Sequence, residues 1–326
     1  MNAVDHNNVV IFDDRGIPSI MCRFVRPKDT EEVLAVFKIG DKVADAIYIS
    51  KYPNIVIDGR AYSMPMADPT VNITFDEAVQ ACRCKGLGWH LMTAVEYEYL
   101  LNQSREKGTM PHGNTDWGKD YYHNEEQGKV SNLGRTYTGT GPVTWNHDHT
   151  PYGVSDLNGN VWEWLAGLRI KDGVIEFIPG NKAASPYCDL SKDSTEWQQA
   201  ETSKGPVRAN VECGEITITD AVAADDYEPN YDGVRIEELE VKLSEIPQVL
   251  KDLGIIPDKR AEEEGKTYVY FDATEGEYLP FRGSAFIIAS NSGPSALSLL
   301  GPRSGSDDNI GFRSAFYEVN GKLITE

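Results

Sequence analysis

The chain has 326 residues, 40% of them hydrophobic and 25% charged, which suits one large domain or two ordinary ones and argues against disorder of the whole chain. Its 51 acidic side chains outnumber 31 basic ones, giving a formal net charge of -20 that repels phosphate backbones, so we expect no nucleic-acid partner. No apolar run approaches the ~20 residues that a bilayer span needs, so we expect no membrane insertion.

Residues 1–65 are expected to form a β-rich segment of short strands and turns, with apolar runs at 9–12 and 46–50. The N-terminus carries no basic patch followed by an apolar stretch, so a signal peptide is not expected. The five cysteines (Cys22, Cys82, Cys84, Cys188 and Cys213) are odd in number and irregularly spaced, which argues against a disulfide framework. Buried or partly buried thiols are the expectation.

Two helices follow, each with a clear start signal. Thr74 and Glu77 have the spacing of a capping box, and Thr93 and Glu96 repeat it. Residues 105–150 are polar and rich in Gly, Asn, Asp and His, which is typical of loops.

A short motif then combines a tight turn with a strand. Asn158-Gly159 is a strong turn signal. Trp162 and Trp164, two residues apart, would project to one face of the following strand, so we expect both to belong to a core scaffold.

Residues 168–275 are interpreted as an inserted, peripheral subregion. Leu239, Val241 and Leu243 alternate like a strand, and Ser244 is expected to cap a helix that ends at Gly254. Acidic residues predict a solvated face there: Glu237, Glu238, Glu240 and Glu262 to Glu264.

The final segment lies between two arginines, Arg282 and Arg313, each of which directly follows a phenylalanine. Phe312, Ser314 and Phe316 alternate as in a half-buried closing strand. We expect Arg282 and Arg313 to be scaffold residues, since a guanidinium can tie together loop carbonyls or a buried carboxylate.

Three blocks together resemble the family of formylglycine-generating enzymes, the sulfatase-modifying factors. The blocks are the second helix region from Leu91 to Tyr99, the Gly153 to Trp164 motif, and the frame from Phe281 to Arg313. The resemblance covers the chain from about residue 70 to the end and implies an α+β, C-type-lectin-like fold with two helices, short strands and much irregular loop. We therefore divide the chain into residues 1–65 and a lectin-like domain over 66–326, with an insertion at about 168–275.

Within that family the last block looks closest to variable proteins of diversity-generating retroelements, whose C-terminal segment is mutagenised. The matching frame is Phe281-Arg282-Gly283 at its start and Gly311-Phe312-Arg313 at its end. The resemblance places a variable region at about 281–313 and implies these ligand-binding residues: Ala285, Phe286, Ile287, Ile288, Ser298, Leu300, Gly301, Gly305 and Asp307. On such a scaffold, Phe286, Ile287, Ile288 and Leu300 would project outwards as a small apolar patch, which is typical of a binding site.

The set of amino acids that a randomised codon can encode supports the same interpretation. Such elements randomise adenines, chiefly in Asn codons, and changes at the first two bases never yield Lys, Glu, Gln, Met or Trp. None of these occurs from Ser284 to Ile310.

The sequence favours neither enzymatic branch of the family. The oxidase branch of the family uses cysteines after the Phe-Arg-Gly anchor, yet no cysteine follows Cys213. His147 and His149, with His112 and His123 upstream, could chelate iron as in another branch, but a polar loop with unpaired histidines is favoured. A structural calcium held by Asp156, Asn158 and Asn160 is left open, because these residues could equally cap turns.

The predicted function is therefore non-enzymatic display of a ligand-binding surface, directed at a protein or cell-surface target. We expect no catalytic residue, no bound catalytic metal and no cofactor beyond the open calcium. A phage or prophage tail, or the bacterial cytoplasm, is the expected location. The alternatives are a formylglycine-generating-enzyme-like activity that depends on a metal or a thiol, and a structural virion protein. The oligomeric state is left open.

Overall fold

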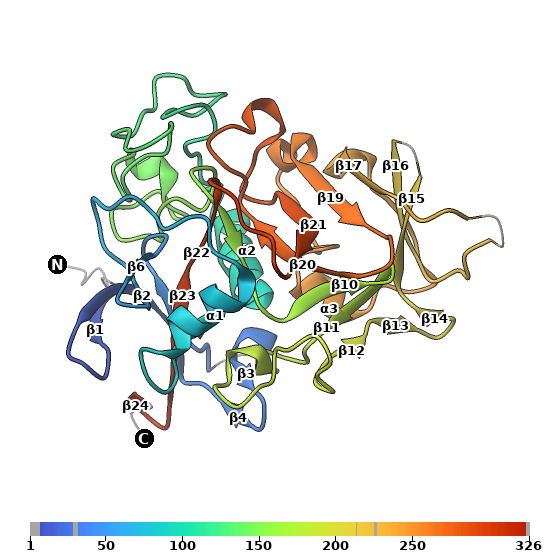
Figure 1. The fold of residues 1–326 in the computed structure, drawn as a ribbon, viewed down its shortest axis with the longest axis horizontal. Helices are drawn as coiled ribbons and strands as arrows, with labels where there is room; N and C mark the ends of the chain where they lie inside the picture. The colour runs from blue at the N-terminus through green and yellow to red at the C-terminus, as the bar shows by residue number, and fades with distance from the viewer. Residues whose placement is uncertain (1–6, 29–31, 213, 225–226, 324–326) are drawn as a thin grey trace.

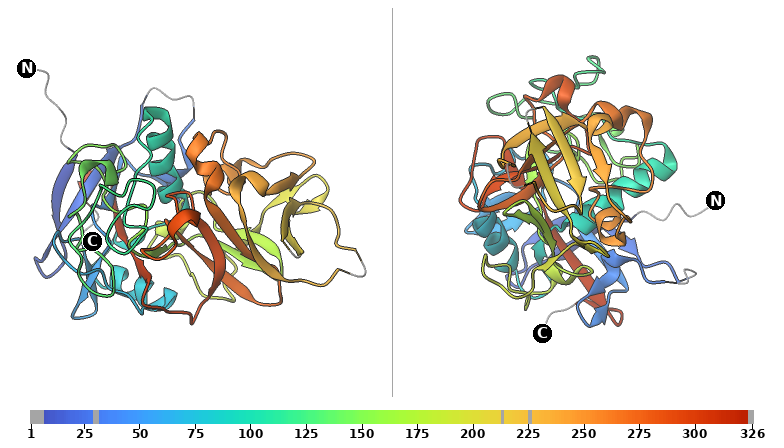
Figure 2. Two further views of the ribbon diagram at one scale, coloured as in Figure 1. Left: turned by 90° about the horizontal axis from the view of Figure 1, so that it is seen from above. Right: turned by 90° about the vertical axis from the view of Figure 1, so that its right-hand side faces the viewer.

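The computed structural model describes residues 7–28, 32–212, 214–224 and 227–323. Two β-sheets lie side by side, and helix α2 (Ala94–Lys107) lies between the N-terminal strands and the C-terminal half (Figures 1 and 2). The chain is thus an α+β protein with few helices and long irregular connections, as expected. Of the helices described, none has the length and apolar character needed to cross a membrane.

The first sheet joins the beginning of the chain to its end. In the described residues it has six strands in the order β1-β2-β5-β23-β24, with β8 pairing β23. Their bounds are β1 (Asn8–Phe12), β2 (Pro18–Val25), β5 (Ala46–Ser50), β8 (His90–Leu91), β23 (Ser314–Val319) and β24 (Lys322–Leu323). Because β5 pairs antiparallel with β23, the N-terminal strands β1, β2 and β5 share a sheet with β23 near the other end of the described residues. The boundary at residue 65 stays a prediction.

The second sheet is larger and has twelve strands over the described residues, with the path β17-β19-β21-β20-β10-β11-β15-β16-β18. These strands are β10 (Leu168–Lys171), β11 (Val174–Phe177), β15 (Arg208–Glu212), β16 (Glu215–Thr219), β17 (Tyr231–Arg235), β18 (Glu240–Lys242), β19 (Tyr268–Asp272), β20 (Glu277–Arg282) and β21 (Leu297–Pro302). Three short strands join its side: β9 (Trp162–Trp164), β12 (Gln198–Gln199) and β22 (Ile310–Phe312).

The remaining elements are short. Three two-stranded sheets pair β3 (Lys38–Ile39) with β4 (Lys42–Val43), β6 (Ile55–Ile57) with β7 (Arg60–Tyr62), and β13 (Glu201–Thr202) with β14 (Gly205–Pro206). The single-turn helices are η1 (Ala35–Phe37), η2 (Val143–Trp145), η3 (Lys182–Ala184), η4 (Ile236–Glu238), η5 (Glu262–Lys266) and η6 (Ala289–Asn291).

Both predicted capping boxes are present. Thr74 begins α1 (Phe75–Arg83) and accepts from the Glu77 amide, while Glu77 reaches back to the Thr74 amide. Thr93 and Glu96 make the same exchange at the start of α2. Each box satisfies amides that have no partner inside the helix, which explains why the sequence located both starts.

The predicted helix after Ser244 is a correction. The helix α3 (Gln248–Asp252) begins only after Pro247. Ser244 instead donates its amide and hydroxyl to the carboxylate of Asp220. Pro247 disfavours helical geometry at Ile246, so the helix cannot begin earlier.

The 168–275 region is less peripheral than expected. Its strands β10, β11, β15 and β16 continue the second sheet, and Ile170, Ile175 and Ile218 are buried in the largest apolar core. Most of the predicted acidic face is exposed, but Glu264 is buried because it forms an ion pair with Arg105.

The closing strand also differs from the prediction. Phe312, Ser314 and Phe316 are buried, and so are their neighbours Arg313 and Ala315. Both faces of β23 are covered, because Ala315 belongs to the largest apolar core whereas Phe316 packs in a separate cluster with Met21 and Trp89.

Candidate ligand-binding surface

Arg313 fixes the closing end of the C-terminal segment and is 0% exposed. Its guanidinium makes a two-point ion pair with Glu163, with Nε–Oε2 at 2.9 Å and Nη2–Oε1 at 2.7 Å. It also donates to the carbonyl oxygens of Ser50 at 2.9 Å, Lys51 at 3.0 Å and Ser155 at 2.9 Å. One side chain therefore joins β9, the end of β5 and the turn that precedes β9, which is the geometry of a scaffold residue.

Arg282 fixes the opening end in a similar way and is 1% exposed. Its Nη1 donates to Glu98 Oε2 at 3.0 Å, and its guanidinium lies 4.9 Å from the centre of the Tyr97 ring. Glu98 also pairs with Arg105, which in turn pairs with Glu264 at 2.8 Å. This chain of charges ties helix α2, the start of the segment and the η5 turn together.

Aromatic rings form the floor between the two arginines. Phe281 meets Trp162 edge-on with 5.3 Å between ring centres, and meets Trp164 with 5.1 Å. Trp164 also packs against Phe75 of α1, at 6.1 Å. Both tryptophans are buried, so they serve the frame of the segment.

The residues predicted as the variable surface divide into three groups. Ala285, Phe286, Ser298 and Gly301 are buried, Ile288, Leu300 and Gly305 are half-buried, and Ile287 and Asp307 are exposed. The expected outward patch is therefore wrong for Phe286, which is only 2% exposed. Its ring packs edge-on against Trp117, with 5.2 Å between the ring centres.

The remaining buried positions have an equally direct cause. Strand β21 lies between β19 and β20 and packs on the aromatic floor. Ser298 lies opposite Phe281 and Tyr270 in the two ladders. A Cβ added at Gly301 would lie 2.5 Å from the Trp164 ring, so this glycine is required by close packing.

Exposed aromatic residues come instead from residues 114–134, which we call the aromatic loop. Trp117 is 59% exposed, and Tyr121, Tyr122 and Leu133 are also exposed. The sequence did contain a signal for this surface, because large aromatic side chains within a Gly- and Asp-rich loop are typical of binding surfaces. We had interpreted this stretch only as a polar loop.

The aromatic loop is bound to the C-terminal segment along its length. The Trp117 amide donates to the Phe286 carbonyl at 2.9 Å, and the Ala289 amide donates to Thr115 at 2.9 Å. The Tyr122 hydroxyl donates to the Ser290 carbonyl at 2.9 Å. Figure 1 shows the green loops beside the orange-red turn of η6. The exposed side chains of both segments therefore belong to one region of the surface.

The expectation of unpaired histidines in a polar loop is wrong, because these histidines have interaction partners. His112 stacks on His123 with 3.6 Å between ring centres, and its Nδ1 lies 3.0 Å from Glu126. His149 lies 3.1 Å from the Met110 carbonyl. Burial lowers the pKa of His147 to about 4, and its Nδ1 accepts from the Val154 amide.

Of the three residues considered as calcium ligands, two already use a side-chain oxygen to accept a hydrogen bond within a turn. Asp156 accepts from the Gly139 amide at 2.8 Å, and Asn160 accepts from the Thr136 amide at 2.8 Å. Both have positive φ, as turn residues do. Within the described part of the chain, no group of three or more His, Cys, Asp or Glu residues is arranged to hold a metal ion.

Burial makes the thiols of three of the four described cysteines poor nucleophiles. Cys22, Cys82 and Cys188 are buried, and burial raises the pKa of Cys22 to about 12 and that of Cys188 to about 11. Cys213 lies outside the described residues. A thiolate is the reactive form of cysteine, so these positions do not favour covalent chemistry.

Comparison with known proteins identifies the class of the central domain. Residues 51–207 match the sequence model of the sulfatase-modifying factor enzyme 1-like domain. The chain thus carries a C-type-lectin-like domain. More particularly, the matched residues, slightly less than half of the chain, are similar to the sulfatase-modifying factor type of this domain.

Individual relatives match less of the chain or match it more distantly. The formylglycine-generating enzyme of Mus musculus is 36% identical over 105 residues, which are 30% of this chain and 27% of that enzyme. Treponema denticola variable protein 1 is 11% identical, with a TM-score of 0.36 over 95% of this chain and 98% of that one. A Major Tropism Determinant I1 variant is 12% identical, with a TM-score of 0.33 over 84% of this chain and 50% of that one.

Proposed function

We propose that the chain is a non-enzymatic ligand-binding protein whose C-terminal segment is diversified by a retroelement and contacts a protein or cell-surface target. One observation carries the proposal. Two buried Arg–Glu ion pairs hold both ends of the segment, while Ile287, Ser290 and Asp307 between them are exposed. Side chains at such positions can change without disturbing the core.

The residues proposed to contact the target are fewer in the C-terminal segment than the sequence predicted, and they include residues of the aromatic loop. From the segment we retain the exposed Ile287 and Asp307 with the half-buried Ile288, and add Ser290 and Ser304. Trp117 and Leu133 of the aromatic loop would supply constant apolar contacts beside them. Rigid aromatic anchors beside small exchangeable residues are the usual composition of diversified binding surfaces.

Location and domain limits are parts of the same proposal. We place the protein on a phage or prophage tail, and divide the chain into residues 1–65 and 66–326 with the variable region at about 281–313. The absence of Lys, Glu, Gln, Met and Trp from Ser284 to Ile310, as randomised adenines in Asn codons would produce, supports the variable region. The source DNA should therefore hold a near-copy of the coding sequence for that region beside a reverse-transcriptase gene.

A displayed library tests the binding surface. Residues 287, 290, 304 and 307 would be randomised together, and clones selected against several unrelated proteins. We expect stable, specific binders. A matched library randomises Tyr187, Lys192, Asp193 and Gln198, which are equally exposed. Equal yields of binders from the two libraries would remove the proposed role of the segment.

The domain match favours one second function, an activity that generates formylglycine. It requires a reactive thiol or a metal, and the described cysteines are buried or half-buried. Incubation with peptides that contain cysteine or serine, followed by mass spectrometry, tests it. We expect no aldehyde product; its formation would establish the enzyme and end our proposal.

A further inference from the structure

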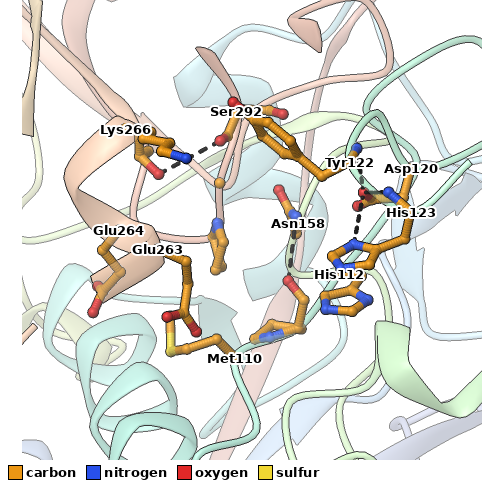
Figure 3. Close-up of a pocket in the computed structure, with 14 residues that line it drawn as sticks. Met110, His112, Asp120, Tyr122, His123, Asn158, Glu263, Glu264, Lys266 and Ser292 are labelled. Carbon is orange, nitrogen blue, oxygen red and sulfur yellow. Dashed lines mark hydrogen bonds and ion pairs between the residues drawn. The ribbon is translucent and has the colours of Figure 1, made fainter. Parts of the chain in front are cut away.

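A cavity of about 300 Å³ lies between the C-terminal segment, the aromatic loop and the η5 turn. Its wall comes from five stretches of the chain: residues 110–112, residues 120–123 of the aromatic loop, Asn158, residues 263–267 at the η5 turn, and residues 292–294. Figure 3 shows the Asn158 side chain in the middle of these stretches, with Glu263 on the Met110 side and Lys266 on the Ser292 side. The volume suits a small metabolite.

Asn158 contributes an acceptor that has no donor. The residue is 6% exposed, its Nδ2 donates to the Pro111 carbonyl at 3.2 Å, and its Oδ1 accepts no hydrogen bond. Leaving a buried acceptor unpaired is unfavourable, so its retention beside a cavity indicates a ligand that donates to it. The tight turn holds the amide in place, because a Cβ at Gly159 would lie 2.1 Å from the Asn114 carbonyl oxygen.

Two exposed charges of opposite sign face the same space. Glu263 forms no ion pair with any described residue, and Lys266 has only a distant contact, 5.9 Å from the centre of the Tyr122 ring. The buried neighbour Glu264 differs, since Arg105 neutralises it. The η5 turn therefore offers one uncompensated anion and one uncompensated cation to the cavity. The carboxylate of Asp120, which also lines the cavity, differs because it accepts from the backbone amides of Gly113, Tyr122 and His123.

Apolar atoms supply the rest of the wall. Met110, Pro111 and Pro294 line the cavity, and the stacked rings of His112 and His123 close one side. An apolar body would be covered by these groups and so removed from water.

We propose that this cavity binds a free α-amino acid with an apolar side chain. The ammonium group donates to Asn158 Oδ1 and faces Glu263, the carboxylate faces Lys266, and the side chain packs on Met110 and the prolines. A simple cation would be repelled by Lys266 and a simple anion by Glu263, whereas a zwitterion uses both charges. Tyr122 of the aromatic loop lines this cavity and also donates to Ser290, so the site adjoins the proposed target-binding surface but recognises its ligand through different groups.

Calorimetry on the full chain tests the proposal with L-leucine, L-methionine and L-phenylalanine as probes. We expect at least one to bind, and its N-acetyl and amide derivatives, which each lack one charge, to bind about tenfold more weakly or not at all, as loss of a charged hydrogen bond predicts. Failure of all three amino acids to bind would overturn the proposal. So would equal affinity for the derivatives.

Paired substitutions locate the site. Glu263→Gln and Lys266→Gln should each weaken binding of the amino acid severalfold, since exposed charges contribute modestly. Glu262→Gln and Lys259→Gln make the same charge changes at exposed neighbours outside the cavity and should leave binding unchanged. Tighter binding by Lys266→Gln would indicate a cationic ligand, and equal effects of control and cavity variants would indicate a general charge effect; both outcomes contradict the proposal.

Discussion

The guanidinium of Arg313 and the carboxylate of Glu163, 150 residues apart in the chain, meet in a two-point ion pair from which solvent is excluded. The pair joins strand β9 to the junction of β22 and β23. It therefore closes the C-terminal segment on the tight-turn motif, and the segment cannot leave its place without exposing a buried charge.

Removing one partner should be costly. Arg313→Met leaves the Glu163 carboxylate buried without its counter-charge, so we expect the free energy of unfolding in urea to fall by about 3–5 kcal/mol. Arg235→Met is the matched control, because Arg235 and Glu237 form an exposed pair at 3.8 Å; its loss should stay below about 1 kcal/mol. Similar losses in both variants would show that burial of the pair contributes little.

Tolerance to substitution should separate positions within the segment. Gly301→Val places new atoms against the Trp164 ring and should lower the free energy of unfolding by about 1–3 kcal/mol. Ser304→Val, in the same segment but exposed, should change it by no more than about 0.5 kcal/mol. Thermal melts of both variants would check this; a Gly301→Val protein as stable as the parent would return position 301 to the variable set.

The aromatic loop should contribute to every binder selected from the segment library. Trp117 presents a large exposed ring that contacts Phe286, the neighbour of Ile287 in the chain, so Trp117→Ala should weaken binding of selected clones about tenfold or more. Tyr187→Ala, at another highly exposed aromatic residue, serves as the control and should leave affinity unchanged. Surface plasmon resonance measures both. Binders indifferent to Trp117 would confine the contact surface to the segment.

Buried Lys85 predicts a specific pH dependence of stability. Burial lowers the pKa of its ammonium to about 7, although Nζ donates to Ser19 Oγ and lies 3.2 Å from the centre of a Trp89 ring. The folded-state pKa is thus below that of the unfolded chain. Above pH 7 the unfolded chain binds more protons, and stability rises with pH until the unfolded pKa is reached.

Comparison with Lys85→Met isolates this effect. Between pH 7 and 9 the parent should gain stability relative to the variant by up to about 1.4 kcal/mol per pH unit, measured by chemical unfolding at each pH. Parallel pH profiles would show that the Trp89 ring keeps the ammonium charged in the folded protein, and the predicted slope would be wrong.

Local signals carried the sequence predictions that succeeded. The starts of α1 and α2 depend on Thr74, Glu77, Thr93 and Glu96, which satisfy amides within the same turn. The Ser244 cap failed because Asp220, distant in sequence, competes for the serine. Such competition leaves no trace in the local pattern.

The site required long-range information. Arg282 and Glu98 are 184 residues apart, so the sequence could assign the arginine a scaffold role but could not name its partner. The burial of Phe286 depends on Trp117 in the aromatic loop. A variable position recognised by resemblance therefore did not show which way its side chain points.

The pairing of β5 with β23 has a consequence for biosynthesis. Strand β5 ends at Ser50, but its partner begins at Ser314, so the first sheet stays open until Ser314 and the residues that follow it have been synthesised. Pairing over such sequence distances is slow. A segment whose new residues prevent closure leaves the β5 edge unpaired, and an open edge recruits other chains. Defective members of a diversified population would thus be lost to aggregation before they reach a target.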